Sequence, residues 1–246
     1  MLAIIGGSGL TKLANLDLTR REFVRTPWGE PSGALIFGNI ANHPVVFIAR
    51  HGYGHTIPPH KVNYRANLWA LWEAKATRVV SVASVGAIRP DIKPGDLLIP
   101  DQVIDYTHDR ATTFHEGLDR PVVHIDFTEP YDEVLRQKLI AATVGAGESA
   151  HIGGTYGATQ GPRLETRAEI NRLARDGCDV VGMTGMPEAS LARELELPYA
   201  AINVVANYAA GRADSQHKVE FDSIEAVLQG AMGRVRRVLE HLCVSC

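Results

Sequence analysis

Short runs of apolar and β-branched residues recur along this chain, and segments with a helical spacing of apolar residues separate them. Runs of this length are typical of strands that are buried on both faces of a sheet. We expect strands at residues 2–5, 44–49, 77–85, 97–104, 151–159, 178–183 and 197–206. We expect helices at residues 61–76, 129–143, 166–176, 189–195 and 223–242. The alternation predicts an α/β fold, with a central, mostly parallel or mixed sheet flanked by helices.

No internal repeat, low-complexity tract or linker divides the chain, so we expect a single domain over residues 1–246. One helix has a specific start signal, because Thr166 and Glu169 have the spacing of a capping box. The segment 105–127 is polar and irregular. We expect that segment to be either a loop over a site or an oligomer contact.

Polar residues stand where five of the predicted strands end, namely Ser8, Arg50, Ser84, Thr184 and Asn207. Ligands of open α/β sheets bind in the crevice at the carboxyl ends of the strands, so we expect these side chains to form one site. The glycine-rich residues 6–10 can form an anion-binding nest. Arg50 can present a planar fork of donors to phosphate, and His51 adds a further donor. Taken singly, each feature also fits an ordinary turn or a solvated loop.

Composition narrows the classes of function. The formal net charge of -3 provides no general basic field for nucleic acid or an anionic membrane, so an anionic ligand needs a local pocket. No apolar segment reaches membrane-spanning length, and residues 1–6 lead into a glycine loop rather than a signal peptide, which predicts a cytoplasmic protein. The odd set of Cys178, Cys243 and Cys246 argues against a disulfide framework. The histidines lack metal-ligand spacing, so we expect no metal.

Five motifs in combination resemble the purine nucleoside phosphorylase family, specifically its methylthioadenosine phosphorylase branch. They are Gly-Gly-Ser-Gly-Leu at residues 6–10, Arg-His-Gly at 50–52, Lys-Val-Asn-Tyr-Arg-Ala-Asn at 61–67, Gly-Pro-Arg at 161–163 and Met-Thr-Gly-Met-Pro-Glu at 183–188. The resemblance covers nearly the whole chain, in order. It implies a homotrimeric α/β enzyme that cleaves the N-glycosidic bond of a purine nucleoside. Inorganic phosphate is then a co-substrate, and no cofactor is needed.

The resemblance also implies roles for individual residues. Those expected to hold phosphate are Ser8, Arg50, His51, the 83–84 region and Thr184. The backbone of Met183 is expected to meet the ribose hydroxyls, and His124 resembles a position that reaches across the trimer towards a neighbour's site. The transition state of such a reaction resembles an oxocarbenium ion. Positioning and charge stabilisation are therefore expected in place of a nucleophilic side chain.

The base-binding positions differ from those of the 6-aminopurine branch that this chain resembles. That branch carries aspartates at the positions of Asn207 and Ala209, and usually a serine at the position of Glu165. The Asn207 amide can accept from the protonated imidazole nitrogen of the base and donate to a 6-oxo group. Glu165 can accept the hydrogen that a 6-oxopurine carries on its pyrimidine ring. We expect Asn207 and Glu165 to be the catalytic, base-reading pair, with Leu164, Tyr208 and Ala209 as further substrate contacts.

An apolar wall is expected at the 5′ end of the nucleoside. The resemblance puts Val219, with Phe221, where inosine phosphorylases carry a histidine near the 5′-hydroxyl; a slipped alignment would place His217 there instead. Apolar residues suit a 5′-methylthio group and leave a hydroxyl unsatisfied. The expected reaction is phosphorolysis of 5′-methylthioinosine to hypoxanthine and 5-methylthioribose 1-phosphate. The alternatives are an inosine/guanosine or 5′-methylthioadenosine phosphorylase, a nucleosidase that uses water, and a non-catalytic nucleotide-binding module.

Overall fold

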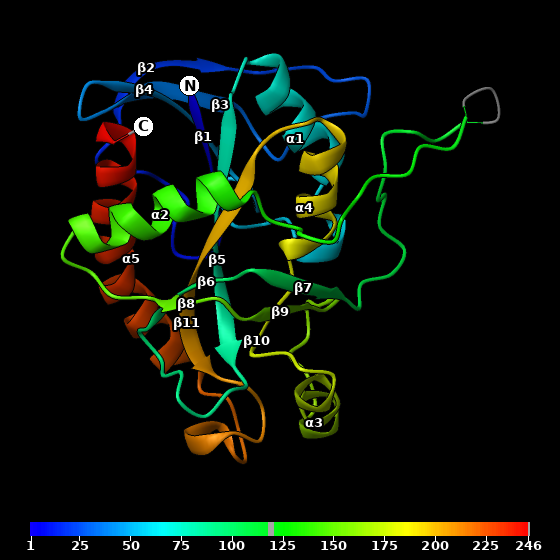
Figure 1. The fold of residues 1–246 in the computed structure, drawn as a ribbon, viewed down its shortest axis with the longest axis vertical. Helices are drawn as coiled ribbons and strands as arrows, with labels where there is room; N and C mark the ends of the chain where they lie inside the picture. The colour runs from blue at the N-terminus through cyan, green and yellow to red at the C-terminus, as the bar shows by residue number, and fades with distance from the viewer. Residues whose placement is uncertain (118–120, 246) are drawn as a thin grey trace.

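The computed structural model describes residues 1–117 and 121–245, in which an eleven-stranded mixed sheet is flanked by five α-helices (Figure 1). The strands are β1 (Leu2–Gly6), β2 (Asp17–Glu22), β3 (Leu35–Ile40), β4 (His43–Ala49), β5 (Arg78–Ala87), β6 (Leu97–Ile99), β7 (Gln102–Asp105), β8 (His151–Ile152), β9 (Thr155–Ala158), β10 (Val180–Gly182) and β11 (Tyr199–Tyr208). The helices are α1 (Tyr64–Glu73), α2 (Glu133–Gly145), α3 (Arg167–Arg175), α4 (Gly185–Glu194) and α5 (Phe221–Val244), with short 3₁₀ turns η1 (Pro59–Lys61) and η2 (Ala213–Ser215).

Strand β5 is the axis of the sheet. It pairs in parallel with β1 over its first half and with β11 over nearly its whole length, and β1 pairs in parallel with β4. The carboxyl ends of these four strands therefore meet at one edge. The last residues of β5 also pair with β10, which runs antiparallel to it. The expected mixed sheet is confirmed.

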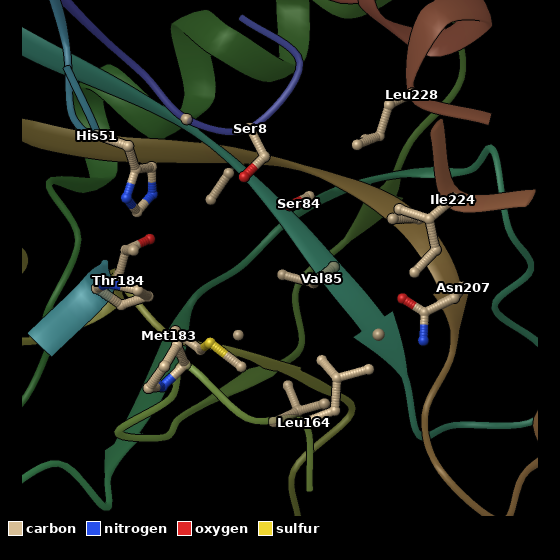
Figure 2. A pocket seen from close by; sticks show the side chains of 18 of the residues that line it. Ser8, His51, Ser84, Val85, Leu164, Met183, Thr184, Asn207, Ile224 and Leu228 are labelled. Atoms are coloured by element: carbon tan, nitrogen blue, oxygen red, sulfur yellow. The ribbon is translucent and has the colours of Figure 1, made fainter. Parts of the chain in front are cut away.

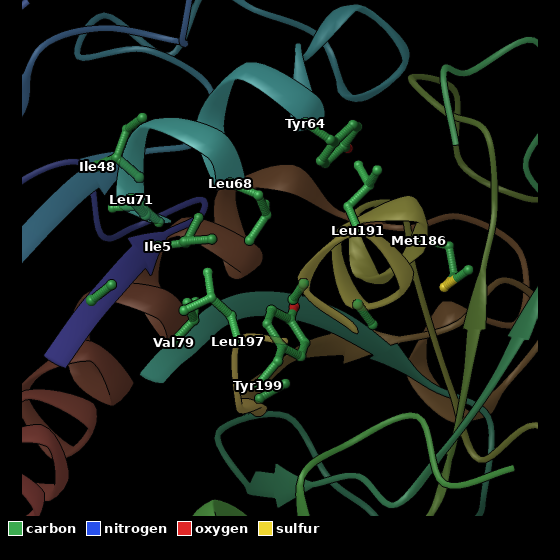
Figure 3. Close-up of a cluster of buried hydrophobic side chains, with 14 of the residues drawn as sticks. Ile5, Ile48, Tyr64, Leu68, Leu71, Val79, Met186, Leu191, Leu197 and Tyr199 are labelled. Carbon is green, nitrogen blue, oxygen red and sulfur yellow. The ribbon is translucent and has the colours of Figure 1, made fainter. Parts of the chain in front are cut away.

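Helices cover both faces of the sheet. Helices α1 and α4 pack on one face, where Leu68, Leu71 and Leu191 meet Ile5 and Val79 (Figure 3). On the opposite face, α2 and α5 bury apolar side chains against β1, β4 and β11. Each buried leucine or isoleucine stabilises the fold by about 1.5–3 kcal/mol relative to an exposed one. The two cores thus hold the central strands, and with them the sheet edge, in a fixed arrangement.

Most predicted elements are found, but two predicted strands are each divided into two. The strand expected at residues 97–104 breaks between β6 and β7 at Pro100, which lacks the amide hydrogen that a strand ladder needs. The strand expected at 151–159 breaks at Gly153 and Gly154, whose φ angles are 85° and 133°. The capping box of α3 is confirmed, since the Thr166 and Glu169 side chains cap each other's backbone amides.

Two strands were missed, and β11 begins and ends two residues later than predicted. β2 is exposed along its whole length and rich in charged residues, so no apolar run marks it. β3 is mostly buried but carries a glycine and an asparagine, which obscured its apolar pattern. β11 continues through Asn207 to Tyr208, and a β-bulge follows Val205.

The segment between β7 and α2 extends away from the rest of the fold over part of its described length (Figure 1). It is anchored by the buried Phe114, whose ring meets that of Trp28 edge-on at 5.4 Å and lies 6.1 Å from that of Trp69 on α1. Residues 118–120 of the segment, for which a loop or an oligomer contact was expected, lie outside the described residues. So does Cys246, whereas Cys178 and Cys243 are buried thiols. In residues 1–117 and 121–245, no helix combines the length and the apolar character that crossing a membrane requires.

Candidate active site

A cavity of about 630 Å³ lies at the carboxyl edge of the parallel strands (Figure 2). This volume is within the range of small-molecule sites. The structure brings the following predicted residues together in its wall: Ser8, Arg50, His51, Ser84, Leu164, Glu165, Met183, Thr184, Asn207, Ala209 and Val219. Two do not line it in this chain, Tyr208, which packs against the core, and His124. Nor does any described residue of segment 105–127, so the described part of this segment does not line the site of its own chain.

Thr184 reaches the cavity by a different route from the other strand-end residues. It follows β10, which is antiparallel to β5, so it approaches Ser84 from the opposite direction. The Tyr156 hydroxyl oxygen accepts a hydrogen bond from the Thr184 backbone N–H at 3.2 Å. Gly182 makes this possible, because a Cβ atom at that position would overlap the Tyr156 hydroxyl group. The prediction that the five strand-end residues lie close together is therefore correct. The prediction that all five strands end in the same direction is wrong for β10.

Arg50 is completely buried and is paired with Glu188, a residue for which no role was predicted. Its Nε and Nη2 atoms donate to the two Glu188 carboxylate oxygens at 2.7 and 2.8 Å. Nη2 also donates to the Ser81 hydroxyl at 2.6 Å, and Nη1 donates to the Val82 carbonyl oxygen at 3.1 Å. Burial opposes the charge of Arg50, but Glu188 outweighs this effect and raises the pKa of the guanidinium above its ordinary value.

The pairing changes what Arg50 can offer to a ligand. The donor fork faces Glu188, so the expectation that this fork would face phosphate is wrong, and one Nη1 hydrogen is left for a ligand. The Glu188 carboxylate is fully satisfied, because Ser81 and Tyr199 also donate to it, each at 2.8 Å. Glu188 could have been identified from its position, since it shares the buried face of α4 with Leu191. A buried acid requires a partner.

His51 is neutral and presents an acceptor. Its Nδ1 atom lies 2.8 Å from the Ile57 carbonyl oxygen, which can only accept, so the ring hydrogen is on Nδ1. Burial and the neighbouring Arg50 lower the pKa of His51 to about 4. At neutral pH, Nε2 therefore carries a lone pair. The ring can accept a hydrogen bond from a protonated oxyanion, so the prediction that His51 would donate to phosphate is wrong for this tautomer.

The β-bulge in β11 positions Asn207. Val205 stands opposite Val85 and Asn207 stands opposite Gly86, so Ala206 is the extra residue. Bulges are frequent beside active sites because they redirect side chains. The Asn207 Nδ2 atom donates to the Tyr208 carbonyl oxygen at 2.6 Å. The side-chain oxygen of Asn207 points towards the other labelled residues of the cavity wall (Figure 2).

Glu165 is also held by a neighbour. The Thr159 hydroxyl donates to the Glu165 Oε1 atom at 2.6 Å. Glu165 lines the cavity, and its second carboxylate oxygen has no protein donor among the hydrogen bonds of the described residues. It can therefore accept from a ligand N–H group. No role was predicted for Thr159, although this residue follows β9 just before the Gly-Pro motif.

The wall near Ser8 is apolar where α5 begins. Val219, Phe221, Ile224 and Leu228 line the cavity, and Figure 2 shows Ile224 and Leu228 side by side there. Val219 and Phe221 were predicted at this wall, whereas Ile224 and Leu228 were predicted only as part of a helix at residues 223–242. His217 is exposed and does not line the cavity, so this chain has no histidine from that segment at the wall.

The loop between β4 and η1 closes another part of the cavity, with His55 and Thr56 in its lining. The His55 and His51 rings are 4.8 Å apart. Over the part of the chain that the structure describes, no three His, Cys, Asp or Glu side chains are grouped so that they could hold a metal ion. The polar groups that the described residues bring to the cavity are hydroxyls, one amide, one carboxylate, the Arg50 guanidinium and the imidazoles of His51 and His55.

Comparison with known proteins gives consistent results. The Phosphorylase superfamily matches the chain over residues 1–243. A probable S-methyl-5′-thioinosine phosphorylase from Xanthomonas campestris pv. campestris is 55% identical over 215 residues, which cover 87% of this chain and 86% of that protein. The 6-oxopurine nucleoside phosphorylase of Pyrococcus furiosus is 49% identical over 215 residues, or 85% and 80% of the two chains. The structure of methylthioadenosine phosphorylase from Schistosoma mansoni in complex with adenine matches with a TM-score of 0.94 at 32% identity, covering 99% of this chain and 91% of that one.

Removing the negative charge that faces Arg50 should destabilise the fold. Glu188→Gln leaves the guanidinium buried without a counter-charge, a change that costs about 3–5 kcal/mol. For a chain of this size, the melting temperature should fall by roughly 6–20 °C, as measured by thermal denaturation. Glu116→Gln is the matched control, because Glu116 pairs with Arg65 at the surface, where an ion pair contributes about 1 kcal/mol or less. Equal shifts for the two variants would contradict a structural role for the buried pair.

Proposed function

Because this chain belongs to the phosphorylase superfamily, we propose that it cleaves 5′-methylthioinosine with inorganic phosphate. The products are hypoxanthine and 5-methylthioribose 1-phosphate. The observation that carries this proposal is the orientation of Asn207, whose nitrogen is bonded to the Tyr208 carbonyl oxygen and whose oxygen is turned to the cavity. The names of the relatives from Xanthomonas campestris and Pyrococcus furiosus support it, since both describe enzymes of 6-oxopurine nucleosides.

Phosphate binds among the hydroxyl groups of Ser8, Ser84 and Thr184, which line one part of the cavity. The free Nη1 hydrogen of Arg50 adds one charged donor, and neutral His51 accepts the phosphate hydrogen at Nε2. These groups hold the phosphate oxygen against the anomeric carbon. Because the transition state resembles an oxocarbenium ion, the phosphate charge stabilises the developing positive charge on the sugar.

The leaving base is stabilised by Asn207. As the glycosidic bond breaks, negative charge develops on the purine, and a proton taken from water onto its imidazole nitrogen neutralises that charge. The Asn207 Oδ1 atom accepts from that protonated nitrogen. Its Nδ2 atom has two hydrogens, of which one is bonded to Tyr208 and the other donates to the 6-oxo group. This bond strengthens as charge moves onto the base, so it lowers the barrier.

Glu165 reads the opposite edge of the base. With one oxygen bonded to Thr159, the other accepts the hydrogen on the pyrimidine ring of a 6-oxopurine. Adenine has a lone pair there, which a carboxylate repels. An unpaired buried polar group costs about 1–3 kcal/mol, so mismatches at Glu165 and Asn207 together give a preference of a hundredfold or more.

The apolar wall distinguishes the 5′ group. Val219, Ile224 and Leu228 offer no partner for a 5′-hydroxyl, whereas a methylthio group gains from contact with them. Cleavage of inosine and guanosine is the second candidate, because it uses the same base contacts. His55 favours this candidate, since it lines the same cavity and carries a polar ring.

A homotrimer of cytoplasmic chains, with His124 directed to a neighbouring site, stays a prediction from the family resemblance. Val122 is 79% exposed and Val123 is 43% exposed in the single chain, and an interface with another copy would cover them. Light scattering on the purified protein tests the prediction, and a mass equal to one chain would contradict it.

A panel of nucleosides tests the proposed reaction. With saturating phosphate, kcat/KM for 5′-methylthioinosine should exceed that for 5′-methylthioadenosine by about a hundredfold and that for inosine by about tenfold. Initial rates of base release measure both ratios. A preference for methylthioadenosine would contradict base recognition by Asn207 and Glu165. A preference for inosine would contradict recognition of the 5′-methylthio group by the apolar side chains at the start of α5. Undiminished turnover without phosphate would identify a nucleosidase.

Replacing the Asn207 amide by a carboxylate should shift the preference towards adenine nucleosides. Asn207→Asp removes the donor to the 6-oxo group and supplies an acceptor for a 6-amino group, so the ratio of methylthioadenosine to methylthioinosine kcat/KM should rise by about 10- to 100-fold. Absolute rates should fall, since a carboxylate oxygen would face the Tyr208 carbonyl oxygen. Asn207→Ala is the control, because it removes both groups and lowers both rates. An unchanged ratio in the aspartate variant would refute the assignment.

A further inference from the structure

Arg110 connects two parts of the active site from behind the cavity, without lining it. Its guanidinium donates to the backbone carbonyl oxygens of Thr159 and Gln160, at 3.2 and 2.9 Å. It also donates to the carbonyl oxygens of Met183 and Met186, at 2.9 and 2.7 Å. One side chain thus holds two segments that are more than twenty residues apart in the sequence.

The remaining contacts complete the coordination of this side chain. The Arg110 Nε atom donates to the Gln160 side-chain oxygen at 3.0 Å, and Nη1 approaches the Tyr64 hydroxyl at 3.3 Å. Of the ion pairs formed by residues 1–117 and 121–245, none involves Arg110. Oriented carbonyl dipoles therefore surround the positive charge, and all three nitrogens are engaged.

The two connected segments carry different halves of the substrate site. The segment that begins at Thr159 and Gln160 leads to Glu165, and the Thr159 hydroxyl is the donor that fixes the Glu165 carboxylate. The turn that begins at Met183 carries Thr184 and lines the cavity. A nucleoside bound between them spans both segments, so their separation determines where the base edge lies relative to the sugar and phosphate.

We propose that Arg110 is a positioning residue that fixes the Glu165 segment against the Met183–Thr184 turn and thereby sets the discrimination between purine bases. The inference rests on the proposed function, because it requires Glu165 to read the base. A misplacement of about 1 Å in a site of this kind can lower the rate by about a hundredfold. The fork geometry matters as much as the charge. A lysine ammonium is a compact donor that cannot span both pairs of carbonyl oxygens.

Arg110→Lys tests the proposal. It keeps the charge, and it should lower kcat. The ratio of kcat/KM for 5′-methylthioinosine to kcat/KM for 5′-methylthioadenosine should fall by about tenfold. In a Glu165→Gln background, the same substitution should cause no further fall in this ratio, because Arg110 acts on the ratio through Glu165. A purely structural role predicts a uniform loss on all nucleosides, with the ratio unchanged in both backgrounds. That result would overturn the proposal.

Arg193→Lys is the matched control. Arg193 also donates to two backbone carbonyl oxygens, those of Asp126 and Glu129, but it contacts neither segment of the site. Its substitution should leave the ratio unchanged. An equal fall of the ratio in this control would show that replacing any arginine bonded to backbone carbonyl oxygens impairs base discrimination. That result would contradict a specific role for Arg110.

Thr159→Val tests the same connection with Arg110 intact, and it decides the question if Arg110→Lys does not fold. Removing the hydroxyl frees the Glu165 carboxylate, so the ratio of 6-oxo to 6-amino kcat/KM should fall. Thr159→Ser keeps the hydroxyl and should leave this ratio unchanged. If the unmodified enzyme prefers 6-aminopurine nucleosides, the proposed function fails. If it prefers 6-oxopurine nucleosides and neither Arg110→Lys nor Thr159→Val alters that preference, the inference about Arg110 fails alone.

Discussion

The hydrogen bond from the Asn207 amide nitrogen to the Tyr208 carbonyl oxygen decides which atom of Asn207 faces the cavity. A carbonyl oxygen cannot donate, so the amide cannot turn its oxygen towards Tyr208 without losing this bond and placing two acceptors together. The β-bulge after Val205 sets the backbone position from which the bond is made. A single local irregularity in a central strand therefore determines the hydrogen-bonding pattern that a purine encounters.

The same principle applies to three other polar groups of the cavity, Glu165, His51 and Arg50. Each has one side bonded to the protein and one side left for a ligand. Thr159 holds one oxygen of Glu165, Ile57 holds Nδ1 of His51, and Glu188 holds the fork of Arg50. Ordering a flexible side chain on binding costs about 0.5–1.5 kcal/mol, so prior anchoring leaves more of the interaction energy for the transition state. A network held in this way also rejects a base whose donors and acceptors are reversed, because the side chains cannot rotate to match it.

The sequence was sufficient to predict the sheet, its helical layers and most of the cavity lining. Apolar runs identified the central strands, and four of these strands are parallel, so Ser8, Arg50, Ser84 and Asn207 lie together as expected. The bulge in β11 and the antiparallel course of β10 could not be predicted, because they arise from pairing between distant strands. Glu188 had a readable signal in its helical position. Arg110 had none, since its partners lie 46 to 76 residues away and are mostly backbone atoms.

A crystal structure of the protein with hypoxanthine and phosphate tests the central claim most directly. Asn207 Oδ1 should lie within about 3.2 Å of the imidazole nitrogen of the base, and the Glu165 oxygen that is not bonded to Thr159 should lie equally close to the pyrimidine-ring N–H. Hypoxanthine bound in the cavity with both side chains turned away from it would contradict the account.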